Sequence, residues 1–179
     1  MQYQDELEQS LQLETRKKLY EAIEENPGLH FRELQRRVNL ATGSLQYHLE
    51  FLQKKHLVRI EKQGKFNRYY TVRGRQFGED SKLMSILRQE SMRKIIVFLL
   101  QKKGANNSKI AENISLSPST TSSHLKKLIE LNLIQKKKKG KEKVYYITEP
   151  DKIALMLVEY KKSFLDEMVE GFADIWQQL

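Results

Sequence analysis

Two stretches of the sequence, 76 residues apart, decide how the chain is organised. They read "SLQYHLEFLQKKHLVRIEKQGKFNRYYTV" from Ser44 and "TTSSHLKKLIELNLIQKKKKGKEKVYYIT" from Thr120, and they align without a gap. A His-Leu pair, a glycine and a Tyr-Tyr pair occupy the same positions in both. Because self-similarity at a fixed offset marks one supersecondary unit used more than once, the sequence predicts two copies of one module.

Each copy has the pattern of three helices followed by a β-hairpin. In the first copy, "TRKKLYEAIEEN" ends at a Pro-Gly pair, "HFRELQRRV" places its apolar residues on one face, and "GSLQYHLEFLQKK" spaces its leucines by three and four. "LVRIEK" then alternates in polarity and returns through Gln63-Gly64 as "FNRYYTV". In the second copy, Ser117 can cap the third helix, with Pro118 at its first position.

Beyond the second copy the chain has no counterpart in the first. Apolar residues recur every three or four positions, which predicts one amphipathic helix of roughly 28 residues within 150–179, about 42 Å long. Such a helix is marginal alone in water, so it either folds back on its own chain or pairs with a second copy. We expect a homodimer, formed by Ile153, Leu157, Tyr160, Phe164, Met168, Phe172, Ile175 and Trp176.

The predicted fold class is mainly α with small β-hairpins (α+β). We expect an N-terminal helical extension, a first module, a connector, a second module and the C-terminal helix, over residues 1–14, 15–73, 74–81, 82–149 and 150–179.

Charge is concentrated in the middle of the chain, whose net charge is +9. Lys and Arg minus Asp and Glu give 14 − 12 = +2 for residues 1–80, 15 − 5 = +10 for residues 81–149, and 3 − 6 = −3 for residues 150–179. A basic balance of this kind favours an acidic partner such as nucleic acid.

Several classes of function lack their motifs. There is no cysteine, which excludes disulfides and thiolate metal sites. No phosphate loop, HExxH motif or acidic metal cluster occurs. We therefore expect no cofactor, no metal site and no catalytic residue, so that the protein is not an enzyme. Without a long apolar segment or a secretory start, a cytoplasmic, nucleoid-associated location is expected.

The segments "ATGSLQYHLEFLQKKHLV" and "SPSTTSSHLKKLIELNLI" each join a short polar turn to His-Leu-x-x-Leu and then to the first hairpin strand. With the glycine-centred hairpin and the closing Tyr-Tyr, they resemble the ArsR- and MarR-like winged helix-turn-helix transcriptional regulators, above all archaeal proteins with two winged helices in tandem. The resemblance covers residues 15–149. It implies double-stranded DNA binding, with the third helix in the major groove and the hairpin, or wing, along the backbone or minor groove. Metal-sensing cysteines are absent.

Candidate DNA-binding residues follow from helix and strand periodicity. A helical wheel centred on Leu45 turns Gly43, Gln46, Tyr47 and Glu50 outward. Glutamine can bond bidentately to adenine, whereas the serines of the second copy equally suit phosphates. The recognition-helix candidates are Thr42, Gly43, Ser44, Gln46, Tyr47, Ser117, Ser119, Thr120, Ser122, Ser123 and Lys126. The wing candidates are Lys62, Lys65, Arg68, Lys136, Lys137, Lys138, Lys139, Lys141 and Lys143, of which about half should face DNA because side chains alternate along a strand.

Two further expectations concern aromatic rings. His48 and His124 fall on the border between core and groove, where a bond to local backbone or phosphate is expected. In each Tyr-Tyr pair, one ring is expected in the core and the other over the wing.

The leading hypothesis is a sequence-specific double-stranded DNA-binding transcriptional regulator, a homodimer with no membrane partner, on which an unidentified small-molecule or protein effector could act. A nonspecific architectural or chromatin protein and a winged-helix docking scaffold are the alternatives. The sequence leaves open the target genes, the sign of regulation and the existence of the effector.

Overall fold

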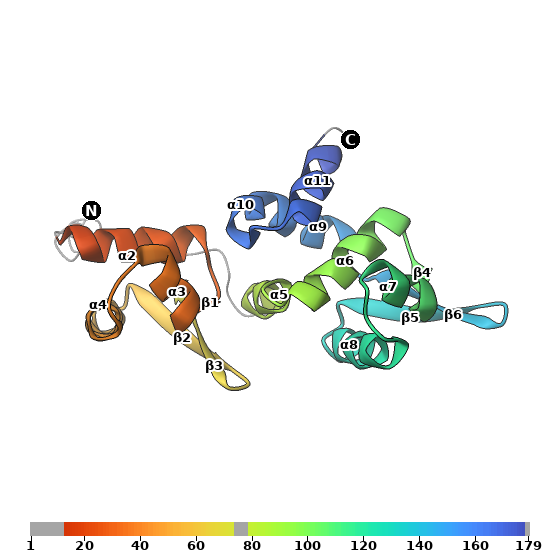
Figure 1. Ribbon diagram of the computed structural model, residues 1–179, viewed down its shortest axis with the longest axis horizontal. Helices are drawn as coiled ribbons and strands as arrows, with labels where there is room; N and C mark the ends of the chain where they lie inside the picture. Colours follow the sequence, from red (N-terminus) through yellow and green to blue (C-terminus); the bar gives the residue numbers. More distant parts are fainter. Residues whose placement is uncertain (1–12, 74–78, 178–179) are drawn as a thin grey trace. The chain divides into compact units, whose positions relative to one another are not determined.

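The computed structural model describes residues 13–73 and 79–177 (Figure 1). The chain forms two compact units that divide at Ser85 and Ile86. The first contains α2 (Glu14–Glu25), β1 (Leu29–His30), α3 (Phe31–Val38), α4 (Thr42–Lys54), β2 (Val58–Gln63) and β3 (Phe66–Thr71). Helix α5 (Glu79–Leu87) spans the division. The second contains α6 (Glu90–Lys102), β4 (Ala105–Asn106), α7 (Asn107–Asn113), α8 (Pro118–Glu130), β5 (Ile134–Lys139), β6 (Glu142–Ile147), α9 (Pro150–Glu159), α10 (Lys161–Phe164) and α11 (Glu167–Trp176).

The predicted fold class and the repeat are confirmed. Strands β2 and β3 coincide with β5 and β6 residue for residue at the 76-residue offset, and α4 coincides with α8. The left-handed residues correspond too, with φ of 51° at Asn39 against 56° at Ser115. Each sheet has a third strand, in the orders β1-β3-β2 and β4-β6-β5. The sequence did not predict β1 and β4, because two residues are too few to show an alternating pattern.

The predicted apolar faces form the core of the first unit. Leu45, Leu49 and Leu52 of α4 pack with Leu19 and Ile23 of α2. Helix α3 is fixed at both ends, because its N-terminus carries a capping box and its C-cap residue adopts the left-handed conformation. This packing holds α3 and α4 against the wing formed by β2 and β3.

The tyrosine pair of the first copy corrects an expectation. Tyr69 lies in the core as predicted, but Tyr70 is only 1% exposed and does not lie open over the wing. Its hydroxyl donates a hydrogen bond to the carbonyl oxygen of Ser81 in α5, at 3.0 Å. This hydrogen bond therefore joins β3 to the start of α5. In the second copy, Tyr145 and Tyr146 are both half-buried.

The C-terminal segment is not one long helix, so that prediction is wrong. It breaks at Tyr160, and again at Leu165, which adopts a φ of 52°. The break lets α11 turn back and pack against α9 and α6. Of the residues assigned to dimerisation, Ile153, Leu157, Phe164 and Phe172 are buried within the chain's own second unit. Of the same set, Ile175 remains exposed, and Tyr160, Met168 and Trp176 are partly covered.

Two other expectations concern the N-terminal extension and membrane-spanning helices. The N-terminal extension, residues 1–14, lies outside the described residues except for its last two. Across the described residues, no helix combines the length and apolar character needed to cross a membrane.

Two glycines should respond oppositely to alanine. Gly104 has a φ of +120°, and a Cβ there would lie 2.5 Å from Cε1 of Tyr146. We expect Gly104→Ala to lower the free energy of unfolding by about 1–3 kcal/mol, through backbone strain and the clash. At Gly43, within α4, no atom lies within 4 Å of such a Cβ, so Gly43→Ala should stabilise the fold by roughly 0.5 kcal/mol. Urea denaturation of both variants checks the pair, and equal effects would contradict it.

Candidate nucleic-acid interface

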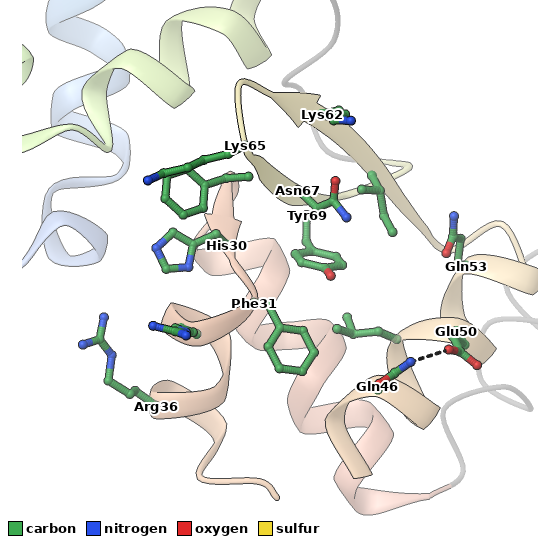
Figure 2. A pocket seen from close by; sticks show the side chains of 14 residues that line it. His30, Phe31, Arg36, Gln46, Glu50, Gln53, Lys62, Lys65, Asn67 and Tyr69 are labelled. Carbon is green, nitrogen blue, oxygen red and sulfur yellow. Dashed lines mark hydrogen bonds between the residues drawn. The ribbon is translucent and has the colours of Figure 1, made fainter. Parts of the chain in front are cut away.

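A groove of about 1200 Å³ runs between α3, α4 and the wing of the first domain. Figure 2 shows Phe31 and Tyr69 between two sets of polar side chains, with His30, Lys65 and Arg36 on one side and Glu50 on the other. We call this the first groove. Its lining comprises His30, Phe31, Arg32, Arg36, Gln46, Leu49, Glu50, Gln53, Ile60, Lys62, Lys65, Phe66, Asn67 and Tyr69. Four cationic side chains and one carboxylate therefore surround an apolar floor.

Among the candidates on α4, Gln46 lines the first groove and Tyr47 does not. The Gln46 amide nitrogen donates a hydrogen bond to Oε1 of Glu50, at 3.1 Å (Figure 2). The NH2 group of Gln46 carries two donors, so one can hold Glu50 while the other, with the amide oxygen, remains for the predicted bidentate bond to adenine. Thr42 accepts a hydrogen bond from Nε2 of Gln35, at 3.0 Å, which ties the start of α4 to α3.

Arg68 is a correction to the wing assignment. It is 6% exposed, and its guanidinium donates a hydrogen bond to the carbonyl oxygen of Gly28, at 2.6 Å. Burial lowers its pKa from the ordinary arginine value, against the raising effects of Glu33 and Tyr70. Arg68 therefore fastens β3 to the turn before β1 and does not reach out to phosphates.

The other wing candidates of the first domain lie at its surface. Lys62 and Lys65 are exposed and line the first groove. Arg59, by contrast, is paired with Glu61 and lies over the ring of Tyr70, at 4.5 Å from its centroid.

Arg32 and Arg36 were missed by the sequence analysis. Both line the first groove from α3. The available signal was their i,i+4 spacing in "FRELQRR", which places both side chains on one helix face. The resemblance to winged helix-turn-helix regulators implies contacts from the third helix and the wing, and so does not single out α3.

In the second domain, Ser117 caps α8 as predicted. Its hydroxyl accepts a hydrogen bond from the backbone N–H of Thr120, at 3.1 Å, and Pro118 occupies the first turn. Asn107 of α7 donates to the hydroxyl of Ser122, at 2.6 Å, and so fixes the turn between α7 and α8. Ser119, Ser123 and Lys126 are exposed on the same helix.

The register of the second wing sorts its lysines between two faces. Ile134 is buried, so Lys136 and Lys138 share its face by alternation along β5. Lys143 of β6 stands directly opposite Lys138 and lies on that face too. The equivalent positions in the first wing are Ile60, Lys62 and Asn67, all of which line the first groove. We call Lys136, Lys138 and Lys143 the groove-side lysines.

The other face carries Lys137 and Lys139. The ammonium group of Lys137 lies 5.7 Å from the ring centroid of Tyr146, and Lys139 stands opposite Glu142 in the register. All the lysines from Lys136 to Lys143 are exposed. Their distribution leaves the groove-side lysines without a cross-strand acidic partner.

The first histidine lies deeper than expected. His48 is buried, and its Nδ1 has no hydrogen-bond partner. Burial lowers its pKa below the ordinary value, and the nearby charge of Arg16 lowers it further. His124 is half-buried. Within residues 13–73 and 79–177, no group of three or more His, Asp or Glu side chains is placed to hold a metal ion.

Two family models match the chain in succession. Residues 13–80 match one described as an N-terminal HTH domain, and residues 82–136 match one described as a bacterial regulatory protein of the arsR family. The protein is a tandem winged helix-turn-helix protein. Both matched segments contain the three helices of their domain, and the first also contains a complete wing.

The tandem winged helix-turn-helix protein is also similar to a longer archaeal protein. An uncharacterized HTH-type transcriptional regulator of Methanocaldococcus jannaschii is 35% identical over 136 residues, which cover 76% of this chain and 34% of the relative. The chain thus spans about a third of that relative's length. Two solved structures of the endosomal ESCRT-II complex show weak likeness, with TM-scores of 0.31 and 0.28 and identities of 16% and 15%. They cover 84% and 75% of this chain and 66% and 65% of theirs, and a likeness this low does not bear on function.

Proposed function

We propose that the tandem winged helix-turn-helix protein is a transcriptional regulator that binds double-stranded DNA at particular sequences. Helices α4 and α8 enter the major groove, and the wings contact phosphates or the minor groove. Both family matches support the class, and the name of the archaeal relative supports the regulatory role. In this proposal the protein acts as a homodimer. That part rests on the resemblance to regulator families, because the C-terminal residues first assigned to dimerisation are mostly covered within one chain.

The observation that carries DNA binding is the pairing of Lys138 with Lys143 in the second wing. Like charges directly opposite each other on neighbouring strands destabilise a sheet. Lys136 adds a third cation to the same face, and a protein gains no stability from this arrangement. A polyanion placed along the face removes the repulsion and releases its own counterions.

Salt dependence and competition test the proposal on the full chain. We expect the logarithm of the binding constant for a DNA duplex to fall linearly with the logarithm of salt concentration, by about 0.9 for each phosphate contact. A flat line would overturn DNA binding altogether.

Genome-wide footprinting then separates a regulator from an architectural protein. A sharp sequence motif with clear half-sites supports the regulator, since the half-sites of a two-fold dimer lie about one or more turns of ~10 base pairs apart. Uniform protection across unrelated sequences would support the architectural alternative. Sedimentation equilibrium of the free protein tests the homodimer, and a monomer at micromolar concentration would contradict it.

A further inference from the structure

The cationic side chains of the first groove come from two sources. Lys62 and Lys65 belong to the wing, and Arg32 and Arg36 belong to α3. The two arginines of this wing are not available to an anion in the groove, because Arg68 is buried and Arg59 is paired with Glu61. Both arginines that line the first groove therefore belong to α3.

Neither Arg32 nor Arg36 is engaged within its own domain. Both are exposed, and among the residues that the structure describes neither forms an ion pair or a hydrogen bond. The nearby carboxylate of Glu33 is used elsewhere, since it accepts a hydrogen bond from the backbone N–H of His30 at 2.9 Å. Like charges four residues apart on a helix repel each other, so this pair does not stabilise α3.

Helix α3 is a rigid support for the two arginines. His30 and Glu33 cap its start reciprocally, and Gln35 bonds to the carbonyl oxygen of Leu40 in the turn that follows. Side chains on such an element keep their direction, which favours bidentate contact between the guanidinium fork and phosphate oxygens.

The second domain has no equivalent on its second helix. At the 76-residue offset, Ser108 and Glu112 occupy the positions of Arg32 and Arg36 on α7. Six lysines, from Lys136 to Lys143, lie on the wing of that domain instead. The two domains therefore have the same backbone fold, but the second lacks the pair of arginines that the first carries on its second helix.

We propose that Arg32 and Arg36 of α3 form a phosphate-contacting site of the first domain, and that α7 takes no such part in the second. This rests on the proposed DNA binding, which it extends to a helix outside the recognition helix and the wing. Glu50, on the opposite side of the first groove, keeps the phosphate backbone toward α3 by repulsion.

The test compares four versions of the 179-residue chain on one DNA duplex. We expect the double variant Arg32→Ser and Arg36→Ser to flatten the salt slope by about 1.8 units, which is roughly a 60-fold loss of affinity at 0.1 M salt. Arg37→Ser is the matched control, because Arg37 neighbours Arg36 on the same helix but does not line the first groove and interacts with Glu33 and Glu25. Its slope should equal that of the unmodified protein.

A lysine variant excludes a merely structural role. Arg32→Lys with Arg36→Lys keeps both charges, so its slope should stay within about 0.3 units of the unmodified protein, and thermal melting should show that all variants are folded. An unchanged slope in the serine double variant would overturn the site, as would equal flattening by Arg37→Ser. If the DNA-binding constant of the unmodified protein does not depend on salt, the proposed function itself is overturned. The two failures are therefore distinguishable.

Discussion

Replacing Asp166 by alanine is expected to lower the free energy of unfolding of the second unit by about 3–5 kcal/mol. The carboxylate accepts a hydrogen bond from Nε of Arg93 and forms a salt bridge with its Nη2, both at 2.7 Å, and both side chains are almost fully buried. The same arginine donates to the carbonyl oxygen of Leu87. Removing Asp166 leaves a buried guanidinium without its counterion, and the desolvation penalty is no longer offset.

Matched variants separate the parts of that effect. Asp166 also caps α11, because its Oδ1 accepts a hydrogen bond from the backbone N–H of Met168. Asp166→Asn can keep this cap but puts an NH2 group in place of the oxygen that faces Arg93, so its remaining loss reports the contact with Arg93 without the cap. Lys161→Ala breaks the pair with Asp174, whose side chain is 65% exposed, and should cost less than about 1 kcal/mol. Urea denaturation measures all three, and an Asp166→Ala loss no larger than that of Lys161→Ala would contradict the prediction.

Removing the groove-side lysines should have the largest effect on binding. We expect the triple variant with serine at Lys136, Lys138 and Lys143 to flatten the salt slope by about 2.7 units, which is roughly a 500-fold loss of affinity at 0.1 M salt. All three lie on the face of β5 and β6 that continues from the buried Ile134. Fluorescence anisotropy with one duplex across a salt series gives both the slope and the affinity.

The opposite face supplies the control for this experiment. Lys137 and Lys139 belong to the same strand, but one lies over Tyr146 and the other stands opposite Glu142. Serine at both positions removes two charges and should flatten the slope by less than about half a unit. If the two variants flatten the slope equally per charge removed, both faces of the wing contribute equally to DNA binding. The assignment of the contacts to one face would then be wrong.

The sequence was sufficient for the repeat and for most of the fold. A gapless 76-residue offset correctly indicates two modules, and the leucine spacing around Leu45 identifies the buried face of α4. The lysine run from Lys136 to Lys139 was recognised as a strand of a wing, but composition alone does not tell which side chains share a face with the core. That assignment requires the register with β6.

The sequence contains a signal against one long, separate C-terminal helix. Residues 95–100 of α6 are six consecutive apolar residues, and all six are buried, whereas the equivalent helix α2 buries only one face. A helix that is apolar all round must be covered on every side, and the C-terminal segment is the part of the chain that covers it. The break at Leu165 was not predictable from periodicity, because a single left-handed residue can reverse the chain without interrupting the three-and-four spacing.

The pairing of Lys138 with Lys143 makes salt act in opposite directions on folding and on binding. Added salt screens the repulsion between the two strands and so steadies the free wing. The same salt reduces the gain from releasing the counterions of DNA, and so weakens the complex. The second wing is therefore most strained in dilute salt, where DNA is held most tightly, and the nucleic acid itself acts as the counterion that the sheet lacks.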